Sequence, residues 1–314
     1  MSNFPDFRID TRWIVTRRGT KNRVYPYKPY SFFSEKERTS EGSIEDILTI
    51  FLTNRECPFK CLMCDLWKNT TDSPVPNGAI PAQIEYALAN MPPARQIKLY
   101  NSGSFFDTHA IPRDDYEKIA ALLDPFDTVI VESHPVFINQ DTLLFKKLIK
   151  GKLQVAVGLE TIHTEVLPRL NKRMTLTGFA QAVKFLTENK IKTRAFILLR
   201  PPFLSEEEGV IWAKKSIEFA FNAGVDACTI IPVRSGNGAM EWLKKNNYFH
   251  PPDIASLEKV TEYGIRLGKG NVFADLWDIE KFSSCEKCFY KRKDRLKHMN
   301  LNQKVYPEIT CTCT

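Results

Sequence analysis

The sequence alternates short, apolar, β-branched segments with longer amphipathic ones, and this alternation constrains the fold most. Segments that are apolar throughout are typical of parallel strands buried on both faces. Ser205, followed by three glutamates, is a typical helix start. Strands are predicted at 47–53, 96–101, 127–132, 153–158, 193–199, 227–233 and 271–276, and helices at 80–91, 113–123, 140–150, 176–190, 205–223 and 253–268. This order predicts an α/β fold, a partial (β/α)6 TIM-like barrel.

The 314 residues divide into three predicted parts: a basic N-terminal extension (1–45), the barrel (46–280) and a small cysteine-rich metal-binding tail (281–314). A hydrophobic content of 43% with 26% charged residues is ordinary for a soluble enzyme. Because no long apolar run and no signal-peptide layout occur, we expect no membrane partner and a cytoplasmic location. In a reducing compartment, clustered cysteines indicate metal ligands rather than disulfides.

Cys57, Cys61 and Cys64 form a C-x3-C-x2-C motif just after the first predicted strand. Three thiolates at this spacing can hold three irons of a cubane 4Fe–4S cluster, and the missing fourth ligand leaves one iron open. Functional residues of such barrels lie at the carboxyl ends of the strands, which is where this motif falls. A structural zinc site and plain buried thiols are the alternatives.

The motif and its position resemble the radical S-adenosylmethionine (SAM) superfamily, whose core is a partial (β/α)6 barrel with the cluster loop after its first strand. The resemblance implies an enzyme in which the amino and carboxylate groups of SAM chelate the open iron. Reductive cleavage of SAM would give a 5′-deoxyadenosyl radical that abstracts hydrogen from a substrate. It also implies an electron donor such as flavodoxin or ferredoxin. The sequence singles out no catalytic side chain for the hydrogen transfer.

Small and polar residues follow the second and third predicted strands. In the family a glycine-rich turn binds the SAM amino group through backbone oxygens, and Asn101, Ser102 and Gly103 occupy its place. An ordinary turn is the alternative. Glu132 opens a Glu-Ser-His-Pro segment that resembles the Glu-(Ser/Thr)-Arg-Pro segment of the Elongator catalytic subunit and its relatives, with His134 where arginine is usual.

Further SAM contacts are implied after later strands. The resemblance implies that Glu160 lies near the ribose hydroxyls and Lys172 near the SAM carboxylate, and a carboxylate and an ammonium suit these partners. A helix cap and a solvated charge are the alternatives. Met63, just before the last cysteine of the motif, and the backbone from Ile231 to Val233 are implied to contact adenine.

Five other residues near the predicted strand ends have assignments of their own. Arg200 lies at the end of the fifth predicted strand and Arg234 at the end of the sixth. Both point toward the substrate side if strand geometry holds, and a solvated arginine is the alternative for each. Cys228 lies inside an apolar strand and is predicted to be core. Phe105 and Phe106 are predicted to be barrel core or lid.

A second cysteine group closes the chain: Cys285, Cys288, Cys311 and Cys313. The C-x2-C and C-x-C pairs supply four thiolates, enough for a closed tetrahedral zinc site that ties the C-terminus to the body. An auxiliary iron–sulfur cluster and unligated thiols remain open, because cysteines alone do not choose between zinc and iron–sulfur.

Within the superfamily, the phrases at 98–107, 131–135 and 157–161 most resemble the group of the Elongator catalytic subunit and the radical SAM subunit of archaeosine synthase. That likeness implies action on tRNA carrying a 7-deazaguanine base. A radical SAM enzyme for a small metabolite or peptide is one alternative. A non-catalytic, metal-stabilised nucleic-acid-binding protein is the other.

The net charge of +7 permits a polyanionic partner. Residues 8–30 combine cations with aromatic side chains, and RNA binding uses both, for phosphates and for unpaired bases. A solvated basic arm is the alternative. The residues concerned are Arg8, Arg12, Arg17, Arg18, Lys21, Arg23 and Lys28, with Trp13, Tyr25, Tyr27 and Tyr30 interleaved.

Overall fold

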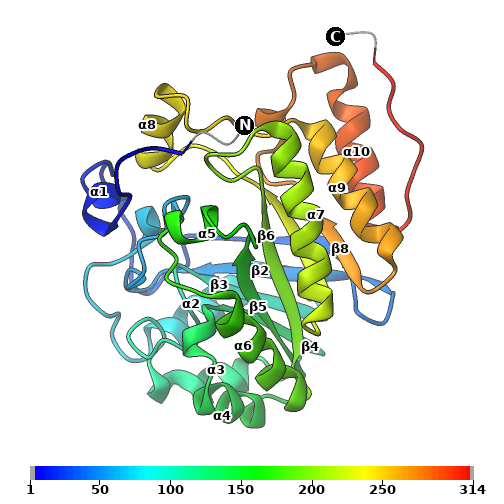
Figure 1. Cartoon of the computed structure of the whole chain (residues 1–314). Helices are drawn as coiled ribbons and strands as arrows, with labels where there is room; N and C mark the ends of the chain where they lie inside the picture. The colour runs from blue at the N-terminus through cyan, green and yellow to red at the C-terminus, as the bar shows by residue number, and fades with distance from the viewer. Residues whose placement is uncertain (1–3, 312–314) are drawn as a thin grey trace.

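The computed structural model describes residues 4–311, and its centre is one curled sheet of eight strands (Figure 1). The strands lie in chain order; β1 pairs antiparallel with β2, and β2 to β8 are parallel. Their bounds are β1 Ser31–Arg38, β2 Ile44–Leu52, β3 Gln96–Asn101, β4 Thr128–Ser133, β5 Lys152–Glu160, β6 Lys192–Leu199, β7 Ala227–Pro232 and β8 Asn271–Ala274.

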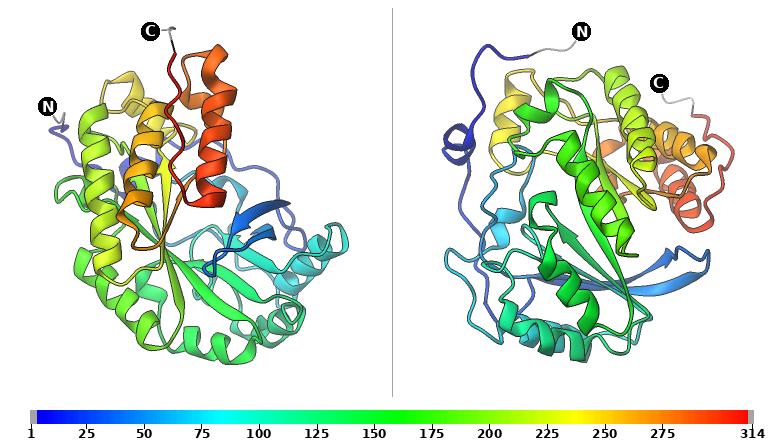
Figure 2. Two further views of the ribbon diagram at one scale, coloured as in Figure 1. Left: turned by 90° about the vertical axis from the view of Figure 1, so that its right-hand side faces the viewer. Right: turned by 60° about the horizontal axis from the view of Figure 1, so that its bottom comes forward.

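Parallel neighbours need a crossover connection, and a helix supplies each one on the outer face of the sheet (Figure 2). The crossover helices are α2 Ala79–Ala89, α3 Tyr116–Leu122, α4 Gln140–Leu148, α6 Leu176–Glu188, α7 Glu206–Asn222 and α9 Ile254–Leu267. Six strand–helix units followed by β8 confirm the predicted partial (β/α)6 barrel. The predicted strands and helices are all present, with ends shifted by up to three residues. Four shorter or peripheral helices complete the set: α1 Thr11–Val15, α5 Val166–Arg169, α8 Ala239–Lys245 and α10 Glu286–Asn302.

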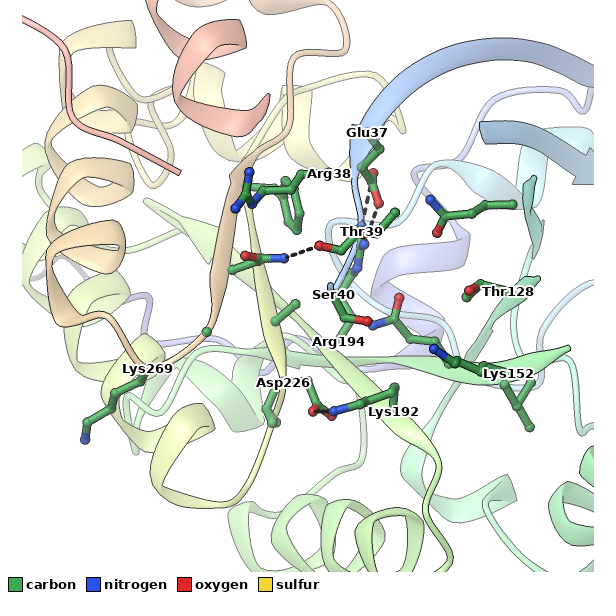
Figure 3. A pocket seen from close by; sticks show the side chains of 18 residues that line it. Glu37, Arg38, Thr39, Ser40, Thr128, Lys152, Lys192, Arg194, Asp226 and Lys269 are labelled. Atoms are coloured by element: carbon green, nitrogen blue, oxygen red, sulfur yellow. Dashed lines mark hydrogen bonds and ion pairs between the residues drawn. The ribbon is translucent and has the colours of Figure 1, made fainter. Parts of the chain in front are cut away.

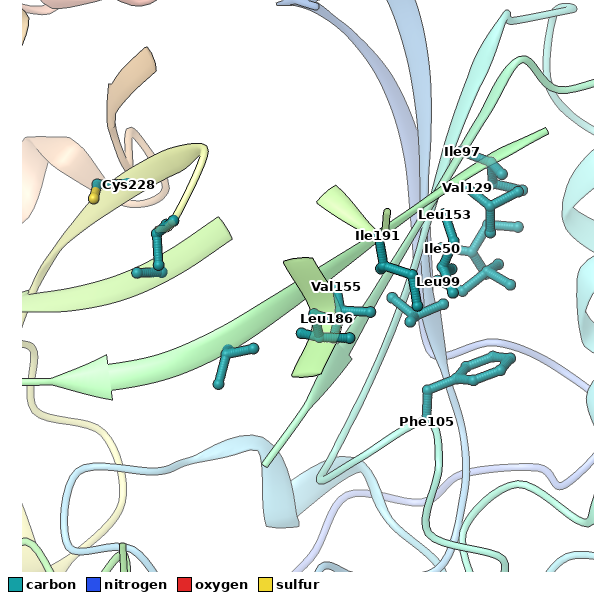
Figure 4. Close-up of a cluster of buried hydrophobic side chains, with 14 of the residues drawn as sticks. Ile50, Ile97, Leu99, Phe105, Val129, Leu153, Val155, Leu186, Ile191 and Cys228 are labelled. Atoms are coloured by element: carbon teal, nitrogen blue, oxygen red, sulfur yellow. The ribbon is translucent and has the colours of Figure 1, made fainter. Parts of the chain in front are cut away.

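The two faces of the sheet differ in chemistry because side chains alternate along a strand. Residues such as Leu99, Val129 and Val155 face the helices and form a fully buried apolar core (Figure 4). Cys228, Phe105 and Phe106 all belong to this core, and core was among the predictions for each of them. The inward positions are more mixed and include charged and aromatic side chains such as Lys98, Arg194 and Tyr100.

The sheet does not close on itself, because β1 and β8 are not paired with each other. Helix α10 packs against both strands and covers the seam between them. The amide of Asn300 bonds to the backbone N–H and C=O of Ala274, and Gln303 does the same at Val272, with distances of 2.7 to 2.9 Å. These side chains satisfy the free edge of β8 that would otherwise pair with another strand.

A polar cavity of about 290 Å³ lies at the amino end of the barrel, the end opposite the cysteine motif (Figure 3). Glu37 from β1 forms ion pairs of 2.6 Å with Lys98 and Arg194 beside it. Burial favours the protonated form of Glu37, but Arg194 and Lys98 outweigh it and hold its pKa at about 2. These pairs link β1, β3 and β6 across the interior.

Among residues 4–311, no helix is long and apolar enough to cross a membrane.

Candidate active site

Cys57, Cys61 and Cys64 lie on the loop after β2, at the carboxyl end of the sheet, and each is half-buried. Within residues 4–311, the only three metal-ligand side chains whose donor atoms all lie within 4.8 Å of one another belong to the second cysteine group. The sulfurs of the motif are therefore spread more widely. One zinc ion holds its sulfurs about 3.8 Å apart, whereas a cubane offers each thiolate a separate iron.

Asparagine side chains hold the cysteine loop in place. The Asn237 amide donates to the carbonyls of Leu62 (2.7 Å) and Cys64 (3.0 Å), and its oxygen accepts the Met240 N–H at the start of α8. From another side, the Asn171 amide donates to the Lys60 carbonyl at 2.8 Å. The loop is thus fixed by segments that follow β5 and β7. In the sequence, neither asparagine differs from an ordinary loop residue.

The turn after β3 packs directly on the cysteine loop. Gly103 has φ +131°, and a Cβ there would lie 3.1 Å from Cβ of Cys57, so only glycine allows this approach. Asn54, just before the loop, pairs with the Ser102 backbone: its oxygen accepts the Ser102 N–H and its amide donates to the Ser102 carbonyl, both at 3.2 Å. The predicted glycine turn and the cysteines therefore form one unit.

Glu132 and Asn101 lie beside this turn. The Asn101 backbone N–H donates to Oε1 of Glu132 at 2.8 Å. Burial raises the pKa of Glu132 to about 8, because nearby positive charge does not compensate for lost hydration. Both polar atoms of the Asn101 side chain are buried without a partner among the described residues. An unpaired buried amide is costly, and this one lies at the end of β3, next to the predicted glycine turn.

Glu160 and Lys172 form a buried ion pair after β5. Glu160 has φ +65°, and Gly158 provides the space: a Cβ there would lie 2.2 Å from Nζ of Lys172 and 2.3 Å from Oε1 of Glu160. Burial alone would lower the pKa of Lys172, but Glu160 and Cys61 raise it, so the ammonium is charged. A carboxylate and an ammonium thus lie next to the cysteine loop.

His134 occupies the position where arginine is usual in the resembling family. Its ring stacks on Phe59 of the cysteine loop, with centroids 4.2 Å apart. Nδ1 accepts the Val136 N–H, so Nε2 carries the proton and donates to the Lys172 carbonyl at 3.0 Å. Burial, together with the nearby Lys172 charge, lowers the pKa of His134 to about 4. The His134 side chain is therefore uncharged, and it packs between Phe59 of the cysteine loop and the backbone of Lys172.

Met63, Ile231 and Val233 belong to one apolar cluster, together with Leu62 and Leu198. The cluster lies between the cysteine loop and the ends of β6 and β7. Met63 belongs to the cysteine motif itself, and Ile231 and Val233 lie at the end of β7 and just beyond it.

Arg200 and Arg234 both have protein partners. The Arg200 guanidinium bonds to Glu206 at the start of α7 and to the Pro251 carbonyl at 2.8 Å, which ties it to the helix layer. Arg234, at the end of β7, pairs with Asp275 after β8 at 2.7 Å. Only Arg234 therefore lies among residues of the barrel mouth.

Six aromatic side chains face the barrel interior and keep part of their surface exposed, unlike the fully buried rings of the outer core. Their ring centroids form a chain with steps of 5.6 to 6.3 Å. The chain begins inside the barrel and reaches the surface where β8 ends. These lumen aromatics are Tyr30, Phe33, Phe51, Tyr100, Phe196 and Trp277.

The second cysteine group gathers at the start of α10. Cys285, Cys288 and Cys311 have sulfurs within 4.8 Å of one another, and the Cys285–Cys311 distance is 3.6 Å. This matches the separation of about 3.8 Å expected around one tetrahedral metal ion. Cys313, the predicted fourth ligand, lies outside the described residues.

The basic N-terminal segment, which includes α1, lies beside α8 (Figure 1). Three of its cations are engaged within the fold. Arg18 and Lys21 pair with Glu56, the residue before Cys57, at 2.7 and 3.0 Å, and Arg17 stacks on Trp13. Four cations and two tyrosines remain exposed: Arg8, Arg12, Arg23, Lys28, Tyr25 and Tyr27.

Comparison with known proteins supports this architecture. No protein-family model matches the chain. Methylornithine synthase superposes with a TM-score of 0.52 at 14% identity, over 72% of this chain and 64% of that chain. A radical SAM methyltransferase from Kitasatospora setae matches with a TM-score of 0.48 at 14% identity, over 63% and 39%. The chain has the partial-barrel fold of the radical SAM enzymes.

Sequence relatives narrow the likeness. An uncharacterized protein of Methanocaldococcus jannaschii is 24% identical over 91% of this chain and 85% of that protein. Archaeosine synthase subunit beta from Thermococcus kodakarensis is 31% identical over 38% of this chain and 39% of that protein. The same subunit from Methanosarcina acetivorans is 26% identical over 64% and 60%. Among radical SAM proteins, the chain is therefore similar to archaeosine synthase subunit beta over part of that protein's length.

Proposed function

We propose that the chain is a radical SAM enzyme that modifies tRNA at a deazaguanine-type base. The observation that carries the proposal is the joining of three features at the carboxyl end of the sheet. These are the cysteine loop, the Gly103 turn packed on Cys57, and the buried Glu160–Lys172 pair. The donor set suits a 4Fe–4S cluster on Cys57, Cys61 and Cys64, with SAM as the second cofactor.

Each side chain has a role that its chemistry supports. When bound, the cluster supplies the electron that splits SAM and so generates the radical that abstracts hydrogen. The backbone oxygens of the Asn101–Gly103 turn would accept from the SAM amino group. Lys172 would pair with the SAM carboxylate, and Glu160 would accept from the ribose hydroxyls. Beside Glu160, Glu132 keeps the turn after β3 in place through the Asn101 N–H.

The apolar cluster provides the remaining SAM contact. Met63 and the segment from Ile231 to Val233 would pack on adenine, since they form one apolar surface next to the cysteine loop. An electron donor such as flavodoxin or ferredoxin would deliver the electron to the half-buried cysteine loop.

Support for a tRNA substrate comes from the relatives and from the exposed basic segment. Two relatives are named archaeosine synthase subunit beta. Exposed cations on the N-terminal segment, beside the cysteine loop, suit contact with RNA phosphates. A small metabolite or peptide is the second candidate substrate.

For the tail, we propose one zinc ion on Cys285, Cys288, Cys311 and Cys313. The close sulfurs of the first three support a single metal ion rather than a second cubane. The metal would fix the C-terminal segment to α10, the helix that covers the seam of the sheet.

The substrate proposal is tested by tRNA binding as a function of salt. Charge reversal of Arg8, Arg12 and Arg23 should weaken tRNA binding and flatten the slope of log affinity against log salt by about one unit per lost contact. Reversal at Lys259, an exposed lysine of α9, serves as the control and should change less. Absence of measurable tRNA affinity, with salt-insensitive turnover of a neutral small molecule, would decide for the metabolite.

A further inference from the structure

The seam between the first and last strands carries an exposed aromatic side chain at the active-site end. Trp277 follows β8, and its ring lies 5.7 Å from Phe33 of β1 and 6.3 Å from Phe51 of β2. It therefore bridges the two sides of the open barrel at the end where the cysteine loop lies. Yet Trp277 keeps 51% of its accessible surface exposed. A flat group that covered this surface would gain favourable burial and stacking.

The rings behind Trp277 continue inward rather than filling the interior. Phe51 lies 6.0 Å from Tyr100, and Tyr100 lies 6.1 Å from Phe196 of β6, across the barrel interior. All of these rings are only half-buried. Rings of the outer core, such as Phe105 and Phe145, are fully buried at similar ring separations. These rings therefore keep part of their aromatic surface uncovered in the lumen.

Polar groups lie at the edge of this aromatic surface. Arg234 and Asp275 pair at 2.7 Å where β7 and β8 end, and both stay partly exposed. The backbone N–H of Trp277 donates to Oδ1 of Asp275 at 3.0 Å, so this carboxylate also fixes the backbone that carries the indole. A guanidinium offers donors and a carboxylate offers acceptors. Together they can read the polar edge of a heterocycle whose faces stack on the rings.

We propose that Trp277 and Phe33 form the stacking platform for the substrate base, a bicyclic purine-like heterocycle, with Arg234 and Asp275 at its edge. The inference rests on the proposed function and adds the site that recognises the base. An RNA base must leave its stack to reach a barrel interior, and stacking on protein rings offsets the loss. Trp277, at the surface end of the chain of rings, is where an extruded base would first meet the protein.

The test measures nucleotide binding to the reconstituted protein by calorimetry, with 7-deazaguanosine 5′-monophosphate as the probe and cytidine 5′-monophosphate for comparison. We expect the bicyclic nucleotide to bind more tightly and to quench tryptophan fluorescence. Trp277→Ala should weaken its binding about 10- to 100-fold, and Trp277→Phe, which keeps a ring, should recover most of it. Tyr290→Ala removes a ring that is 77% exposed on α10 and is the matched control, with unchanged affinity expected.

Failure of this inference is distinct from failure of the proposed function. Release of 5′-deoxyadenosine by the reduced wild-type protein without nucleotide tests the proposed function alone. Equal affinity of wild type and Trp277→Ala, or no preference for the bicyclic nucleotide, would overturn the stacking platform. Unfolding curves of both Trp277 variants show whether a loss of affinity reflects loss of fold. If Trp277→Ala is unfolded, the affinities of Trp277→Phe for the bicyclic nucleotide and for cytidine 5′-monophosphate decide, and equal affinities would overturn the stacking platform.

Discussion

Gly158→Ala tests whether the Glu160–Lys172 pair depends on the absence of a side chain beneath it. The added Cβ would lie 2.2 Å from Nζ of Lys172 and 2.3 Å from Oε1 of Glu160, so both groups must move by about 1 Å or more. Overpacking of this kind costs about 1–3 kcal/mol. Separating a buried ion pair costs about 3–5 kcal/mol when one charge is left uncompensated. The pair is about nine-tenths buried, so solvent screens it little.

We therefore expect Gly158→Ala to lower the free energy of unfolding by about 2–4 kcal/mol in urea titrations. We also expect SAM affinity to fall by about tenfold or more, since the pair would no longer face its ligand. Gly19→Ala is the matched control, because a Cβ at Gly19 meets nothing within 4 Å. If Gly158→Ala unfolds within 0.5 kcal/mol of wild type and binds SAM equally well, the role of this pair is wrong; ~0.5 kcal/mol is the usual effect of a neutral surface change.

Two further predictions concern the remaining charged and metal groups. Because the pKa of Glu132 is raised to about 8 by burial, the folded protein holds this proton more tightly than the unfolded chain. The free energy of unfolding of wild type relative to Glu132→Gln should thus fall as pH rises from about 5 to 8, by at most about 1.4 kcal/mol per pH unit; parallel pH curves would refute this. His134, with its pKa lowered to about 4, titrates in both proteins and cancels. Cys288→Ser should remove zinc from the purified protein while about four irons remain, and elemental analysis that finds about eight irons and no zinc in wild type would mean a second cluster instead.

The barrel could be predicted because short strand-like segments alternate with longer amphipathic ones along the sequence, but β1 could not. Residues 31–38 read Ser-Phe-Phe-Ser-Glu-Lys-Glu-Arg, which resembles a solvated charged segment. In the fold, Glu37 points inward, and Lys98 and Arg194 neutralise its charge. Both cations lie far from Glu37 in the sequence. No local pattern reveals partners that only the curled sheet brings together. Helix α10 was hidden in the same way, since its buried face includes Arg295, which Glu258 and Glu262 neutralise.

The cofactor ligands were visible in the sequence, but their supports were not. Three cysteines at a fixed spacing predict a cluster because the chemistry demands that spacing. Asn54 and Asn237 hold the loop and the turn, yet as single polar residues after strands they resemble ordinary loop residues. Their position just beyond the ends of β2 and β7 is the signal that could have found them.

In the basic N-terminal segment, the sequence shows the cations but not which of them the fold pairs. Arg17, Arg18 and Lys21 were predicted to be available for phosphates, because charge in a sequence is unpaired until the fold is known. In the structure Glu56 takes two of them, and Trp13 stacks on the third. Exposed cations such as Arg8 and Arg23 are therefore the better positions for testing RNA contact.

Release of 5′-deoxyadenosine tests the central claim most directly. The protein is reconstituted with iron and sulfide under anaerobic conditions, reduced, and incubated with SAM. Wild type should release 5′-deoxyadenosine, and Cys57→Ala, Cys61→Ala, Cys64→Ala and the triple variant should release none, because two thiolates cannot hold an open cubane. Wild type that contains about four irons per chain yet releases none, or a triple variant that still releases 5′-deoxyadenosine, would contradict the account.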